Sequence, residues 1–106
     1  MREVAYRPRA AYDAESIVTY ISVVLRSPQA AENWYVELEK TLDLLCGQPL
    51  LGREFDDPCL KHHCFRSFLV SNYRLFYTFT ATTLTVWRVI HTTQDLSDYG
   101  FVDWGE

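Results

Sequence analysis

The basic side chains of this 106-residue chain are concentrated in a stretch that has no acidic ones. Residues 58–91 contain no aspartate or glutamate. The cationic side chains and imidazoles of this stretch are Lys61, His62, His63, Arg66, Arg74, Arg88 and His91. Cations without counter-charges repel one another, so such a surface is typical of a site for an anionic partner, and an imidazole can transfer protons near neutral pH. The stretch therefore predicts an anion-binding surface.

The net charge of −4 arises in the C-terminal residues. Residues 92–106 carry no lysine or arginine, and their acids are Asp95, Asp98, Asp103 and Glu106. The other 10 of the 14 acids balance the 10 bases of residues 1–91. The acidic residues would repel a long polyanion, whereas a short acidic protein segment can neutralise the basic stretch locally. We therefore expect a protein rather than a nucleic acid as the anionic partner.

Two apolar stripes in the first half of the chain have the period of an amphipathic helix. The first stripe consists of Ala10, Ala14, Ile17, Ile21 and Leu25, and the second of Ala31, Trp34, Leu38, Leu42 and Leu45. Pro8 and the pair Ser27-Pro28 are typical of helix starts, and Gly47 followed by Pro49 is typical of a helix end. Because only a residue or two join the helices, we expect an antiparallel hairpin with both stripes buried.

The second half of the chain changes to the composition and period of β-strands. Strands are predicted at residues 3–7, 65–70, 73–80 and 84–91, the last three joined by turns at Ser71-Asn72 and Ala81-Thr82. A helical hairpin must cover one face of such a sheet, because neither layer buries its apolar side alone. We therefore predict an α+β fold of two layers, in the order β-α-α-β-β-β, with an antiparallel sheet. Residues 1–106 form one domain, with an acidic tail at about 92–106.

Composition excludes several other classes of protein. With 48% hydrophobic residues and only four glycines and four prolines, the chain is neither disordered nor repetitive. No apolar run approaches the roughly 18 residues of a membrane span, and residues 1–4 do not resemble a signal peptide, so we expect a cytoplasmic protein without membrane contact. The glycines are too scattered to form a phosphate-binding loop, and we predict no cofactor.

One short cluster has the residue types of a zinc site. Its members are Cys59, His62, His63 and Cys64. A structural zinc site usually draws its ligands from two paired motifs, and Cys46 and His91 are the only spare candidates for a second pair. We therefore predict no metal site, and three reduced cysteines.

A series of short motifs, in order along residues 6–95, resembles a known family. The motifs are Tyr6-Arg7-Pro8 with Ala10-Ala11, Ile17 with Tyr20-Ile21, Ala30-Ala31, Gln48-Pro49-Leu50-Leu51-Gly52-Arg53, Phe65-Arg66, Tyr73-Arg74-Leu75-Phe76-Tyr77, Arg88-Val89-Ile90-His91 and Gln94-Asp95. In order and spacing they resemble the RelE/ParE superfamily of bacterial toxins, the toxic halves of type II toxin–antitoxin systems. The likeness is closer to ParE, the plasmid-stabilisation type. The resemblance implies the same order of strands and helices as derived above.

The resemblance implies one of two activities. RelE-like toxins cleave mRNA on the ribosome without a metal, and ParE-like toxins poison DNA gyrase. Arg66 and Arg88 match positions where the ribonuclease branch carries phosphate-binding arginines, and His91 lies near a position that supplies an acid or base. The ribonuclease branch is usually rich in lysine and arginine, whereas this chain has two lysines, a pI near 5.3 and no catalytic candidate directly after His91. We therefore predict weak or no RNA cleavage, with Arg66, Arg88 and His91 as the catalytic residues if cleavage occurs.

The resemblance also implies an antitoxin as the anionic partner. Antitoxins of this superfamily fold a disordered C-terminal segment over the toxin, and we expect contacts at Lys61, Arg66, Arg74 and Arg88. Gyrase is a further expected partner, the ribosome and mRNA a less favoured one, and we expect oligomers only through the antitoxin complex. Two alternatives stay open: a partner-binding remnant without toxicity, and arginines that pair internally with Glu54, Asp56 or the C-terminal acids.

Overall fold

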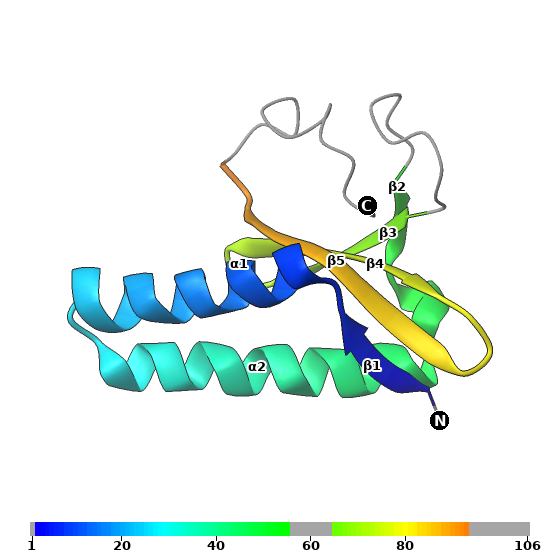
Figure 1. The fold of residues 1–106 in the computed structure, drawn as a ribbon, viewed down its shortest axis with the longest axis horizontal. Helices are drawn as coiled ribbons and strands as arrows, with labels where there is room; N and C mark the ends of the chain where they lie inside the picture. Colours follow the sequence, from blue (N-terminus) through cyan, green and yellow to red (C-terminus); the bar gives the residue numbers. More distant parts are fainter. Residues whose placement is uncertain (1, 56–64, 94–106) are drawn as a thin grey trace.

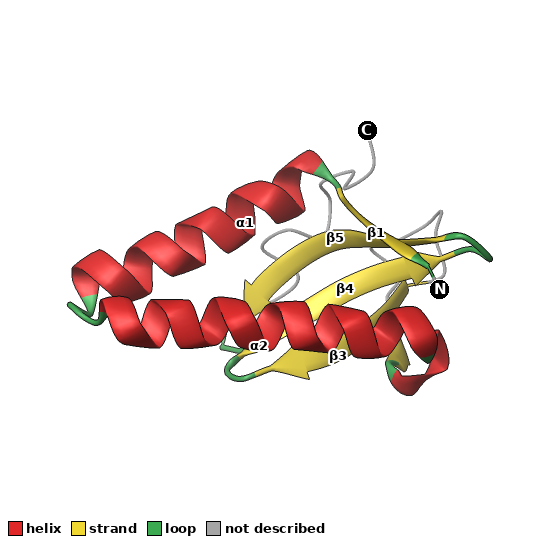
Figure 2. Ribbon diagram, turned by 90° about the horizontal axis from the view of Figure 1, so that it is seen from below, coloured by secondary structure: helices red, strands yellow, loops and turns green. Residues whose placement is uncertain are grey.

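Two helices lie across one face of a five-stranded sheet in the computed structural model, which describes residues 2–55 and 65–93 (Figure 1). The elements are β1 (Glu3–Tyr6), α1 (Pro8–Thr19), the π-helical turn η1 (Tyr20–Val24), α2 (Pro28–Gly47), the 3₁₀ turn η2 (Pro49–Leu51), β2 (Arg53–Phe55), β3 (Phe65–Val70), β4 (Tyr73–Phe79) and β5 (Thr83–His91). Figure 2 shows α2 running along the sheet and α1 beside it. The predicted α+β fold of two layers is confirmed.

The sheet is mixed, with the order β1-β5-β4-β3-β2. The pairs β3-β4 and β4-β5 are antiparallel, as expected, and β2 is antiparallel to β3. In contrast, β1 runs parallel to β5, with Tyr6 opposite Val86. The prediction of a wholly antiparallel sheet is therefore wrong at this edge, because the helical hairpin returns the chain to its starting side before the meander begins. The short strand β2 was also not predicted, since three residues are too few to show an alternating pattern.

The helix starts follow the local signals in the sequence. Pro8 and Pro28 occupy the first turns of α1 and α2, and the Ser27 hydroxyl accepts a hydrogen bond of 3.3 Å from the Ala30 amide. The end of the first helical stripe differs from the prediction. In η1 the Leu25 amide donates to the Tyr20 carbonyl five residues back, so the helix phase shifts and Leu25 is 56% exposed.

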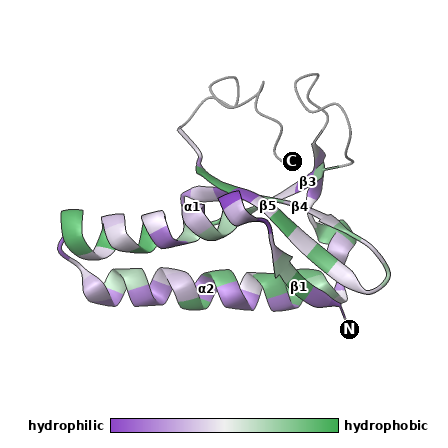
Figure 3. Cartoon of the chain, viewed as in Figure 1, coloured by the Kyte–Doolittle hydropathy of each residue, from purple (hydrophilic) through white to green (hydrophobic). Residues whose placement is uncertain are grey.

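The core lies between the helices and the alternate residues of β4 that face them. Leu38, Leu45, Leu75, Tyr77 and Leu84 are fully buried there. Tyr73, Leu75, Tyr77 and Phe79 share this face of β4, since all four belong to or pack against the core. The far end of the hairpin is not covered in this way. There η1 contains apolar residues, coloured green in Figure 3, and they are exposed at the surface.

One buried tyrosine organises the segment that follows α2. The Tyr77 hydroxyl donates to the Pro49 carbonyl at 2.6 Å and accepts from the Gly52 amide at 3.0 Å. A side chain at position 52 would collide with the Tyr77 ring, so glycine is required there for steric reasons. The tyrosine thereby places η2 and β2 next to β3.

Candidate functional site

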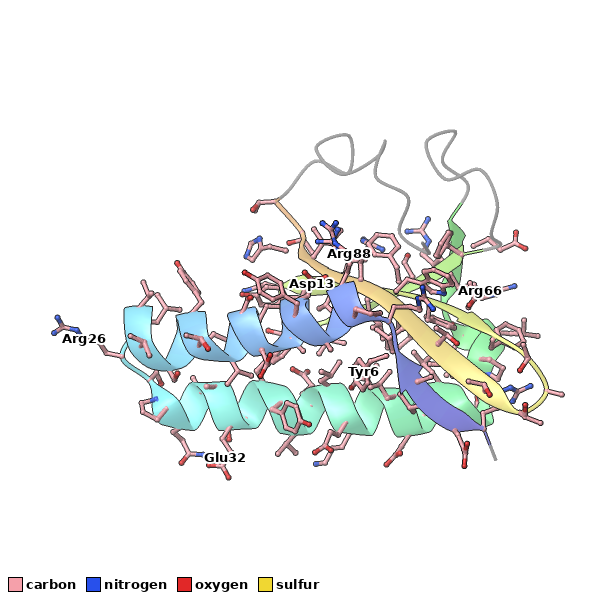
Figure 4. All side chains as sticks on the ribbon, in the orientation of Figure 1. Tyr6, Asp13, Arg26, Glu32, Arg66 and Arg88 are labelled. Atoms are coloured by element: carbon pink, nitrogen blue, oxygen red, sulfur yellow. The ribbon has the colours of Figure 1, made fainter. Side chains whose placement is uncertain are left out.

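Arg88, predicted as a site residue, forms a buried ion pair with the helical layer. Its Nε donates to Asp13 Oδ2 at 2.6 Å and its Nη2 donates to Asp13 Oδ1 at 3.1 Å. The two side chains are 5% and 12% exposed, and Figure 4 shows them meeting between β5 and α1. A bidentate pair of this kind fixes both groups in orientation. The expectation that the cations of residues 58–91 lack counter-charges is therefore wrong for Arg88.

Asp13 also completes the hydrogen bonding of β5. The pairing of β1 with β5 ends where the Arg7 amide donates to the Val86 carbonyl at 2.9 Å, so among the described residues no strand lies beside the next part of the β5 edge. There Asp13 Oδ2 accepts a hydrogen bond of 3.0 Å from the Val89 amide. A β-bulge between these two points shifts the register of β5 against β4. Asp13 thus stands in for a strand partner and joins α1 to the sheet.

Arg66 occupies a more open position, on β3. Its Nη1 donates to the Gly52 carbonyl at 2.7 Å, and its Nη2 lies 3.7 Å from Glu54 Oε1. The Arg66 side chain is 20% exposed and that of Glu54 is 84% exposed. This bears out the alternative that Arg66 pairs internally with Glu54, although an ion pair with so exposed a partner is weak.

The predicted cations do not form one surface. Arg66 stands opposite Tyr77 in the sheet and so shares its face, whereas Arg74 alternates to the other face and donates to Ser67 Oγ at 3.0 Å. Arg88 turns toward Asp13. Lys61 lies outside the described residues.

His91 lies in a cleft of about 930 Å³ between α1, η1 and the end of the sheet. Its Nδ1 accepts a hydrogen bond of 3.1 Å from the Thr93 amide, which places the proton of the neutral ring on Nε2. The Tyr73 ring contacts the imidazole edge to face at 5.1 Å between centroids, and burial together with the neighbouring Tyr20 raises the pKa of Tyr73. The cleft is lined by both aromatic and polar residues.

The three residues predicted for RNA cleavage are divided between two places. Arg88 and His91 both line the cleft, but the Arg88 guanidinium is held by Asp13. Arg66 instead contacts the loop around Gly52. Sequence reasoning missed Asp13, and the available signal was an acidic side chain beside the apolar stripe of the first helix.

Two further observations concern metal ligands and membrane spans. Within residues 2–55 and 65–93, no three histidine, cysteine, aspartate or glutamate side chains gather as metal ligands would. The cluster Cys59, His62, His63 and Cys64 lies outside those residues. No helix in the described part of the chain is long and apolar enough to cross a membrane.

The order of a strand, a helical hairpin and a meander is the one that the resemblance to the RelE/ParE superfamily implies. The family model described as "ParE toxin of type II toxin-antitoxin system, parDE" matches residues 4–96, so the chain belongs to this family. A solved structure entitled "Chromosomal ParDE TA system from P. aeruginosa" has a similar fold, with a TM-score of 0.67 and 16% identity, over 86% of this chain and 96% of that chain. No curated protein matches the sequence. The predicted superfamily is confirmed.

Proposed function

We propose that this ParE-family toxin acts by binding and inhibiting a cytoplasmic target, DNA gyrase, and not by cutting RNA. The observation that supports this most is the state of Arg88, which is 4% exposed and bound through two nitrogens to Asp13. Cleavage of RNA without a metal needs cations that are free to meet the charge that develops on phosphorus, beside an acid and a base. A guanidinium committed to a buried carboxylate is poorly placed for that role.

The separation of Arg66 from His91 supports the same proposal. General acid–base catalysis requires its groups within hydrogen-bond reach of one substrate. His91 lines the cleft beside α1, while Arg66 holds the Gly52 carbonyl on another part of the sheet. RelE-type cleavage is therefore the less favoured activity, and the likeness to ParE-like toxins supports gyrase as the proposed target.

We further propose that an antitoxin neutralises the toxin by covering the basic residues of the sheet. Arg66 is the best-placed contact, because its side chain is partly exposed and its ion pair with Glu54 is long. Lys61 and Arg74 remain proposed contacts. Arg88 would contribute by holding the wall of the cleft rather than by direct contact, since it is buried.

Two assays on the same purified protein test the proposed activity. One measures gyrase-dependent breaks in supercoiled DNA, and the other measures ribosome-dependent cuts in mRNA. We expect DNA breaks and intact mRNA. If the protein cuts mRNA and a folded Arg66→Ala variant does not, the chain is a RelE-type enzyme instead. If expression does not slow growth and neither assay responds, the chain is a non-toxic remnant.

Co-expression with the product of the neighbouring gene tests the antitoxin contact. We expect the two proteins to co-purify, and Arg66→Glu to weaken the complex at least about tenfold, because it places an acid opposite an acidic segment. Arg26→Glu is the matched control, since Arg26 lies at the far tip of the helical hairpin (Figure 4). Equal losses in both variants would contradict the assignment of Arg66.

A further inference from the structure

A second open region lies between α1 and α2. It is a groove of about 1050 Å³, and its walls include Tyr6 of β1, Tyr35 of α2 and Ala11, Ala14 and Val18 of α1. Figure 4 shows Tyr6 between the two helices. The small alanine side chains leave room in the groove. Its surface is mainly apolar, although it is open to solvent.

The groove has the composition of a protein-binding site. Tyr6 is 39% exposed and Tyr35 is 45% exposed, and Tyr12 and Tyr20 also border the groove. Tyrosine is among the residues that most often dominate the energy of a protein interface. The lining residues of α1 and η1 run from Ala11 to Val24, so this wall extends over about 20 Å at 1.5 Å per residue. A helical peptide of about 16 residues is long enough to span that length.

The charge of the groove is negative. Glu15 lines it on the α1 wall, and no lysine or arginine is among its lining residues. On the α2 side Glu39 is not a lining residue, but it follows Tyr35 by one helical turn and lies close enough to act on the Tyr6 hydroxyl. Burial, Tyr35 and Glu39 together raise the pKa of Tyr6 to about 12, so its hydroxyl stays a neutral donor. Acids on the α1 and α2 sides favour an occupant with positive charges along its two sides.

The same charges argue against two other occupants. A second copy of this chain would bring the same two walls, and Glu15 and Glu39 of the two copies would repel one another. Residues 94–106 carry four acids and no lysine or arginine, so they have the same sign as the groove. The acidic segment proposed to cover Arg66 is disfavoured here for the same reason.

We propose that the groove between α1 and α2 binds an amphipathic helix of a partner protein, with an apolar stripe facing Tyr6 and Tyr35 and lysine or arginine on both flanks. This surface is independent of the contact at Arg66. The toxin would then carry two docking surfaces of opposite charge, one for an acidic segment and one for a basic helix.

Two designed peptides of about 16 residues test the proposal. They share one leucine stripe at helical spacing, and their flanks carry either lysine and arginine or glutamate. Fluorescence anisotropy with the purified chain measures binding of each labelled peptide. We expect the basic peptide to bind at least about tenfold more tightly than the acidic one, and the difference to shrink as salt is added.

Variants of exposed glutamates locate the binding. Glu15→Lys combined with Glu39→Lys should reverse the preference between the two peptides. Glu37→Lys is the matched control, because Glu37 lies on α2 beside Asn33 and Lys40, away from the groove. Circular dichroism shows that each variant is folded. Equal binding of both peptides, binding of neither, or a reversal caused by Glu37→Lys would overturn the proposal. None of these results depends on gyrase or on the antitoxin.

Discussion

Arg88 and Arg66 look alike in the sequence but have different roles in the structure. Both are strand arginines in a stretch without acids. Arg88 is 4% exposed and is held by two hydrogen bonds to Asp13, whereas Arg66 reaches a loop carbonyl and an exposed carboxylate. The first arginine joins a helix to the sheet. The second holds a surface loop and can still meet a partner.

The difference shows what charge segregation along a sequence can and cannot indicate. The absence of acids between residues 58 and 91 does not mean that the cations lack counter-charges, because folding brings Asp13 from 75 positions away. A partner-binding role is therefore better supported for the arginine whose ion pair is long and exposed. The predictions below test this distinction, from the largest expected effect to the smallest.

Arg88→Ala should destabilise the fold the most. It leaves the Asp13 carboxylate nearly buried without its cation, and breaking a buried pair in this way costs about 3–5 kcal/mol. Urea unfolding followed by circular dichroism measures the change in the free energy of unfolding. The double variant Asp13→Ala/Arg88→Ala should cost less than the sum of the two single variants. A loss below about 1 kcal/mol for Arg88→Ala would mean that the pair does not join α1 to the sheet.

Tyr77→Phe should have the next largest effect. It removes only the hydroxyl, leaving the Gly52 amide and the Pro49 carbonyl without their buried partner. A buried group that loses its hydrogen bond costs about 1–3 kcal/mol. The same urea titration measures the loss. Tyr12→Phe is the matched control, because Tyr12 is 71% exposed, and it should leave the free energy of unfolding unchanged.

The sequence predicted those parts of the fold that depend on local signals. The helix starts at Pro8 and at Ser27-Pro28 and the strands 65–70 and 73–80 were found because caps, turns and periodicity act over a few residues. The change of helix phase before Leu25 was not predicted, because a single π-helical turn does not alter the apolar pattern of a helix.

The candidate site was less predictable because its contacts are long-range. His91 and Arg88 were identified by residue type, and the structure places both in one cleft. Their partners were not identified: Asp13 comes from the first helix, and the parallel pairing of β1 with β5 joins the two ends of the described chain. Which charges neutralise one another is decided by topology, and local patterns carry little information about it.

Arg66→Ala should cost less than either variant above. It removes a hydrogen bond to the Gly52 carbonyl that water can replace, and an ion pair with a Glu54 that is 84% exposed. We expect a loss of about 1 kcal/mol in urea unfolding. A loss as large as that of Arg88→Ala would remove the distinction between the two arginines, and would make Arg66 a structural residue only.

The smallest expected effect is a change with pH in the cost of Arg66→Ala. Burial raises the pKa of Tyr77, while the Gly52 amide and Arg66 oppose this rise. The fold therefore favours the neutral phenol: this contribution to stability is complete below about pH 10, the pKa of an unfolded tyrosine, and is lost as the pH rises further.

Without Arg66 the pKa of Tyr77 rises more, so the loss continues to a higher pH. The cost of Arg66→Ala should thus stay constant up to about pH 10 and grow above it, and it should stay constant with pH throughout in a Tyr77→Phe background. Unfolding curves of the four proteins on both sides of this pH measure the difference. A cost that does not change with pH in either background would show that the guanidinium and the phenol do not interact.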